Sequence, residues 1–104
     1  NYSQNTTRRH NIIVGIGYGS DLKKAKEILY RLAKECPTAL QEPPAVVYVE
    51  ELADSSVNLS LRIWSNTGNY LETRFYLIEQ IKLTFDKEGI EIPFPQRDVH
   101  IISQ

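Results

Sequence analysis

Residues 57–64 alternate between apolar and polar side chains, and this pattern constrains the fold of the 104-residue chain most strongly. The apolar positions are Val57, Leu59, Leu61 and Ile63, and the positions between them are Asn58, Ser60, Arg62 and Trp64. Because successive side chains of a strand point to opposite faces of a sheet, the alternation predicts a strand with one buried face. Other elements must therefore cover that face.

Two other segments are predicted to be strands. Residues 11–18 are rich in β-branched side chains, and they place Ile12, Val14, Ile16 and Tyr18 on one face. Residues 45–50 read AVVYVE and predict a second strand. The turn at residues 52–55 is short, so this strand and residues 57–64 are expected to form an antiparallel hairpin.

Two helices are predicted, one after the strand at residues 11–18 and one after the strand at residues 57–64. The first begins within residues 19–21, where Ser20 can cap free N–H groups and Asp21 suits the positive end of the helix. It runs to about Glu35 before Pro37 stops it. The second begins within residues 67–69 and ends at Gly89. Their apolar stripes are expected to be Leu22, Ala25, Ile28, Leu29, Leu32 and Cys36 in the first helix, and Leu71, Phe75, Ile78, Ile81 and Phe85 in the second.

The order strand, helix, strand, strand, helix, strand predicts an α+β fold. It is the ferredoxin-like split βαβ sandwich (βαββαβ), with both helices on one face of the sheet. Residues 90–94 form a short strand candidate that Pro93 interrupts, and residues 96–102 form an extra C-terminal strand candidate behind Pro95. We divide the chain into a polar linker (1–9), a folded domain (10–94) and a C-terminal strand (95–104).

Composition excludes several classes of function. The formal net charge is −1, which does not favour binding to a polyanion. The strand at 57–64 also lacks the glycine and the stacking aromatics of RNA-binding split βαβ domains, so we expect no nucleic-acid partner. No apolar run approaches the roughly 20 residues that span a membrane. The chain begins with Asn1 rather than Met, so we expect a piece of a larger protein.

No segment carries a motif of an enzyme or a cofactor site. Gly15, Gly17 and Gly19 lie between a strand and a helix, but Ser20 stands where a dinucleotide fingerprint needs glycine, so a structural role is favoured. His10, Cys36 and His100 lack the spacing of metal ligands. We expect solvated or terminal histidines, a buried cysteine, no metal, no cofactor and no enzymatic activity.

The C-terminal segment GIEIPFPQRDVHII (89–102) is the least ordinary part of the sequence. A strand behind Pro93 and Pro95 does not easily continue the sheet of its own domain, yet its backbone groups need partners. One interpretation is a frayed terminus. The other is pairing with the same strand of neighbouring subunits, because a closed ring of strands leaves no edge.

Several stretches together resemble the cytoplasmic C-terminal region of small-conductance mechanosensitive channels, the MscS family. They are NYSQNTTRR leading to VGIGYGSDLKKAKEIL, then LADSSVNLSLRIW, and GIEIPFPQRDVHI. The stretches cover nearly the whole chain in the order expected for that family.

The resemblance implies the cytoplasmic part of a homoheptameric channel in the inner membrane that releases small solutes on hypo-osmotic shock. Residues 10–94 would form the wall of a hollow vestibule, and residues 1–9 would link it to an upstream middle β domain. The subunit interface would be a β-barrel strand made of Gln96, Arg97, Asp98, Val99, His100, Ile101 and Ile102. The isolated chain would not conduct ions, and we expect it to be monomeric or weakly associated.

One other function remains open at this stage. A regulatory domain of the same ferredoxin-like fold could bind a small molecule at a strand–helix loop. In this chain the loop would be residues 17–20.

Overall fold

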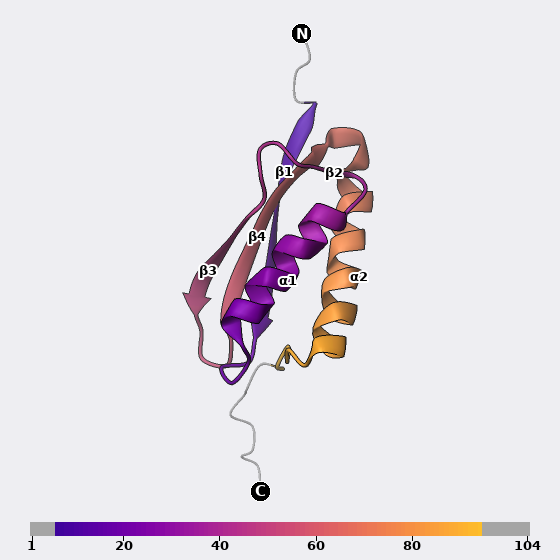
Figure 1. The fold of residues 1–104 in the computed structure, drawn as a ribbon. Helices are drawn as coiled ribbons and strands as arrows, with labels where there is room; N and C mark the ends of the chain where they lie inside the picture. Colours follow the sequence, from indigo (N-terminus) through magenta and orange to yellow (C-terminus); the bar gives the residue numbers. More distant parts are fainter. Residues whose placement is uncertain (1–5, 95–104) are drawn as a thin grey trace, which may run out of the picture.

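The structure, a computed structural model, describes residues 6–94. Two helices, four strands and one short 3₁₀ helix follow in the order β1 (Thr7–Ile16), α1 (Leu22–Glu35), β2 (Ala39–Leu40), β3 (Val46–Leu52), β4 (Val57–Asn66), η1 (Thr67–Asn69) and α2 (Tyr70–Glu88). The two helices run in opposite directions across one face of a twisted sheet, as Figure 1 shows. This arrangement confirms the predicted α+β class and the placement of both helices on one face.

β4 is the strand that all the others share. β1 pairs with it antiparallel along one edge, with Thr7 opposite Asn66 and Ile16 opposite Val57. β3 and the two-residue β2 pair antiparallel with its other edge. The predicted hairpin is therefore confirmed as β3–β4, and its ladder is irregular between Val49 and Glu51.

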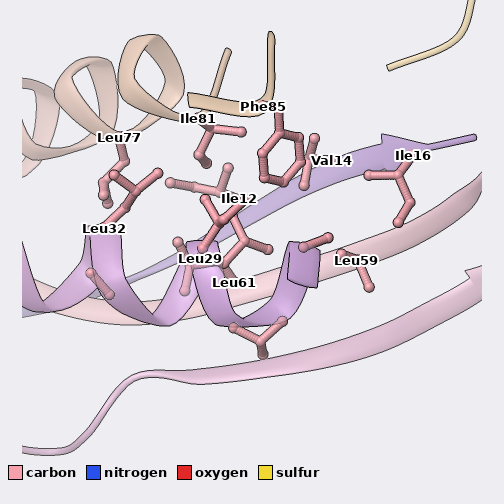
Figure 2. Close-up of a cluster of buried hydrophobic side chains, with 14 of the residues drawn as sticks. Ile12, Val14, Ile16, Leu29, Leu32, Leu59, Leu61, Leu77, Ile81 and Phe85 are labelled. Carbon is pink, nitrogen blue, oxygen red and sulfur yellow. The ribbon is translucent and has the colours of Figure 1, made fainter. Parts of the chain in front are cut away.

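Apolar side chains from the helices and the sheet meet in one core (Figure 2). The alternation that predicted β4 is confirmed, because Leu59, Leu61 and Ile63 are all buried. α1 contributes Ala25, Ile28, Leu29, Leu32 and Ala33, and α2 contributes Leu77, Ile81 and Phe85. Burial of this much aliphatic and aromatic surface is the main stabilising term for the fold.

Helix α1 matches its predicted bounds, but its cap and one stripe residue differ from the prediction. Asp21, not Ser20, is the N-cap, and its Oδ1 accepts a hydrogen bond from the Lys24 backbone N–H at 3.1 Å. Leu22 is 37% exposed, because it lies in the first turn beyond the edge of the core. Cys36 is buried as predicted.

The predicted apolar face of α2 is wrong in part. Ile81 and Phe85 are buried, but Leu71, Phe75 and Ile78 are 60%, 61% and 44% exposed. The buried face instead follows a spacing of four through Thr73, Leu77, Ile81 and Phe85. The Thr73 hydroxyl lies 2.6 Å from the Thr38 hydroxyl, so this polar side chain is satisfied in the core.

The ends of the strands also differ from the prediction. β1 begins at Thr7, among residues assigned to the linker, and ends at Ile16. Tyr18 was expected on the buried face but is 55% exposed, and its hydroxyl donates to the Ala53 carbonyl. Sequence reasoning missed β2. Residues 90–94 form no strand in the described structure, although Ile90 is buried and the Gly17 N–H donates to the Glu91 carbonyl at 2.9 Å.

Candidate functional site

The predicted barrel strand, Gln96–Ile102, lies outside the described residues, and so does His100. The remaining candidates fall into four groups: the glycine-containing loop after β1, the buried polar cluster around His10, two exposed surfaces with aromatic side chains, and a charged hollow between α1 and α2.

Two residues of the loop at 17–20, Gly17 and Ser20, contact residue 91 of the same chain. A Cβ atom at Gly17 would lie 2.8 Å from Glu91 Oε1, so glycine lets the 91 segment approach closely. The Ser20 hydroxyl accepts a hydrogen bond from the Glu91 N–H at 3.2 Å. Gly15 likewise makes room for side chains of the sheet, since a Cβ atom there would lie 2.8 Å from Asn58 Oδ1. These contacts support a structural role for Gly15 and Gly17.

His10 is fully buried, which corrects the expectation of a solvated or terminal histidine. Its Nε2 lies 2.8 Å from Ser65 Oγ, and its ring stacks on Tyr70 with centroids 4.2 Å apart. The Arg8 guanidinium lies over the same tyrosine ring at 3.9 Å. Sequence reasoning missed this cluster, although His10 shares the alternation of Ile12, Val14 and Ile16 and could have been assigned to the buried face.

The environment of His10 disfavours the charged form of the imidazole. Burial lowers its pKa below 6.5 because the charged ring would lose hydration, and the nearby positive charges of Arg74 and Arg8 lower it further. Its Nδ1 is buried and has no hydrogen-bond partner within residues 6–94. No group of three His, Cys, Asp or Glu side chains in this part of the chain could hold a metal ion.

The lowered pKa of His10 predicts that acid destabilises the domain. Between pH 6.5 and the lower pKa of the folded state, the unfolded chain binds a proton at this residue and the folded chain does not. The free energy of unfolding should therefore decrease as the pH is lowered through this window, by up to about 1.4 kcal/mol per pH unit. His10→Phe, which keeps a ring against Tyr70, should flatten this slope in urea titrations between about pH 5 and 6.5.

Leu52→Phe, which changes an exposed side chain of β3 and no titratable group, is the control for this experiment and should leave the slope unchanged. A slope that is the same in His10→Phe and in the original chain would show that other groups cause it.

The first exposed surface runs along α2. Leu71, Phe75 and Ile78 follow one another at spacings of four and three, so they form one stripe on the helix, here named the outer stripe. Ile78 also lines a shallow groove of about 140 Å³ between α2 and the edge of β1. In the described structure β1 pairs with β4 alone, so no strand covers that edge.

The second exposed surface lies on the face of the sheet opposite the helices. Arg9 is opposite Trp64, and Val46 is opposite Arg62, so these four side chains share that face. With the loop before β3 they form a pocket of about 190 Å³, here named the sheet pocket, lined by Arg9, Pro43, Pro44, Val46, Tyr48, Arg62 and Trp64. The Arg62 guanidinium lies 5.1 Å from the Tyr48 ring and 3.9 Å from a Glu50 oxygen.

A third hollow lies between the start of α1 and the end of α2 and is mainly charged. Arg31 donates to Glu88 Oε2 at 2.7 Å, and this hydrogen bond lowers the pKa of the Glu88 carboxyl. Because both side chains are solvated, the pair adds little stability. Asp21, Lys24, Arg31 and Glu88 are paired within the chain, so we assign this hollow a structural role.

Neither helix of the described residues is long and apolar enough to cross a bilayer.

Comparison with known proteins identifies the family. Residues 10–92 match the model of the family described as "Mechanosensitive ion channel MscS, C-terminal". An uncharacterized MscS family protein of Archaeoglobus fulgidus is 46% identical over 99 residues, which cover 95% of this chain and 35% of that protein. A small-conductance mechanosensitive channel of Edwardsiella ictaluri is 36% identical over 101 residues, covering 97% of this chain and 35% of that channel.

A solved structure agrees with these matches. The crystal structure of Helicobacter pylori MscS in the closed state superposes with a TM-score of 0.82 at 29% identity, covering 95% of this chain and 40% of that one. This chain thus spans about a third of the length of the relatives it matches. Because the family match extends over residues 10–92, the chain belongs to the MscS family of mechanosensitive channels and carries its C-terminal domain.

Proposed function

We propose that this chain is the vestibule and assembly domain of a mechanosensitive channel. In this role, seven copies form the wall of a hollow chamber on the cytoplasmic side of the inner membrane. The channel releases small solutes when hypo-osmotic shock stretches the membrane. The domain itself shapes the chamber and joins subunits, and it neither conducts ions nor catalyses a reaction.

The match to the C-terminal part of longer channel proteins is the observation that carries this proposal. The exposed surfaces support it, because aromatic and arginine side chains are enriched where proteins associate. The outer stripe and the sheet pocket both present such side chains to solvent.

The flanking segments complete the proposal. Residues 1–9 would enter from an upstream β domain, with Thr7 to Arg9 already part of β1. Residues 95–104 would supply one strand to a seven-stranded barrel on the symmetry axis, with Gln96–Ile102 as the subunit interface. Each backbone group of that strand would then find a partner in a neighbouring copy.

The barrel is tested by a charge placed in its strand. In the full channel subunit, Val99→Asp or Ile101→Asp should reduce the heptameric fraction at least severalfold, because the ring would hold a poorly compensated charge. Native mass spectrometry of the purified channel measures that fraction. Leu52→Asp, on a side chain that is 71% exposed in β3, is the matched control and should leave the heptamer intact. Unchanged heptamers in the Val99 and Ile101 variants would rule out the barrel.

The 104-residue chain alone should behave differently from the full subunit. Without the upstream segments it should remain monomeric or associate weakly, because those segments would hold much of the heptamer contact. Light scattering across a range of concentrations measures this directly. A stable heptamer of the isolated chain would contradict the expectation.

A further inference from the structure

We propose that the outer stripe of α2 on one copy docks into the sheet pocket of a second copy of this chain. The inference rests on the proposed function, since it assumes that copies of the domain assemble side by side. It names two surfaces, both within residues 6–94, that meet between neighbouring copies. This contact is separate from the one that the barrel strand would make.

The outer stripe has the character of a docking element. Phe75 stands at its centre and is 61% exposed, although it is a large aromatic side chain on a well-formed helix. Burying a phenylalanine side chain contributes about 1.5–3 kcal/mol, so covering an exposed one with a partner would favour association by a free energy of this order. With Leu71 and Ile78 it offers three anchors at successive helical turns, which is the pattern of a helix that packs against a partner.

The sheet pocket has the character of a receptor for such an element. It is open to solvent, and two prolines, Trp64 and Tyr48 supply rigid apolar walls. Its volume of about 190 Å³ suits one or two apolar side chains of the stripe. Trp, Tyr and Arg are the residues that most often dominate the energy of protein interfaces.

The charges on one side of the stripe complement those of the pocket. Glu72 and Glu79 are exposed and are three and four residues from Phe75, so they flank the stripe on one side. Lys82 continues the stripe, but it is already paired with Asp86 at 2.9 Å. Arg9 and Arg62 line the pocket, and Arg62 makes only a long contact with Glu50 at 3.9 Å. Opposite charges at the rim of an interface favour the correct pairing and fix its register.

The positions of the two surfaces permit a ring. Tyr70 stacks on His10, so α2 begins at the end of the sheet where Arg9 lies opposite Trp64. Figure 1 shows the start of α2 and the start of β1 at the same end of the domain. A rotation about an axis along the strands would keep both surfaces at the same height along that axis, so the stripe of one copy could lie beside the pocket of the next. Because the two surfaces differ, the contact is head-to-tail, and it forms a closed ring when the rotation between neighbours closes.

Cysteine cross-linking in the full channel subunit tests the contact. In a Cys36→Ala background, subunits with Phe75→Cys are mixed with subunits with Pro44→Cys before assembly and then mildly oxidised. We expect a disulfide-linked dimer that requires both variants. A subunit that carries both substitutions should give a ladder longer than a dimer, because each copy then links to two neighbours.

Leu83→Cys in place of Phe75→Cys is the matched control. Leu83 is 54% exposed on the same helix but lies off the stripe, so it should cross-link at least tenfold less. Efficient cross-linking of Phe75→Cys alone would overturn the proposal by showing that two stripes face each other. Oligomers without a link between positions 44 and 75 would also overturn it, while leaving the proposed function intact. The absence of any oligomer would count against the proposed function itself.

Discussion

Phe85→Ala is expected to lower the free energy of unfolding of the 104-residue chain by about 3–5 kcal/mol. Phe85 is fully buried on α2 and contacts the core of the sheet and both helices (Figure 2). Its removal loses the favourable burial of the ring and leaves a cavity that the surrounding side chains fill only in part. Domains of this size have a total stability of about 5–15 kcal/mol, so the loss is a large fraction of it.

Phe75→Ala is the matched control for this substitution, because it changes the same residue type on the same helix. Phe75 is 61% exposed, so its truncation should change the stability of the monomer by less than about 1 kcal/mol. Thermal unfolding followed by circular dichroism should show a midpoint lowered by about 15 °C or more for Phe85→Ala only. Equal losses in both variants would contradict the described orientation of α2.

Leu29→Asn should have an effect of similar size, for a different physical reason. Leu29 is fully buried on α1, and asparagine keeps the same number of side-chain heavy atoms with the same branching, so most of the change is in polarity. It removes about 1.5–3 kcal/mol of apolar burial. It also places an amide without partners in the core, which costs about 1–3 kcal/mol more. The expected loss in the free energy of unfolding is therefore about 4 kcal/mol.

Urea titration of the chain measures this loss, with Leu83→Asn as the control. Leu83 is 54% exposed on α2, so its replacement should cost only the lower helix propensity of asparagine, about 0.5 kcal/mol. A loss below about 1 kcal/mol for Leu29→Asn would mean that water or a polar group reaches this position.

The sheet and α1 could be predicted from the sequence because each has a single apolar pattern. Leu59, Leu61 and Ile63 can only face one way in a strand, and Ile28, Leu29 and Leu32 lie on one side of a helix whose other positions are mostly charged. In both elements the apolar pattern and the buried face coincide.

α2 could not be oriented in the same way because it has apolar residues on more than one side. Its sequence supports a stripe through Leu71, Phe75 and Ile78 and another through Leu77, Ile81 and Phe85. Only the packing of the domain selects the second stripe, which includes the polar Thr73 because Thr38 satisfies its hydroxyl. The stripe that the monomer leaves exposed is the one assigned here to a neighbouring copy.

The exposed surfaces were beyond sequence reasoning for a related reason. The sheet pocket combines Arg9, Pro44 and Trp64, which are far apart in the chain and meet only because β1 and β3 both pair with β4. The barrel strand, in contrast, was identified by resemblance to the family, and it stays a prediction.

The central position of β4 has a consequence for how the domain opens. Its partners on β1 lie 41 to 59 positions away in the chain, so this pairing cannot form until the intervening segments are in place. Once the sheet has formed, β4 cannot separate from β1 on one edge, or from β3 on the other, without breaking the hydrogen bonds that hold the sheet together. Amide hydrogens in the middle of β4 should therefore exchange with solvent only through global unfolding. A chamber built of such domains would change shape by moving whole domains against one another, and not by bending within them.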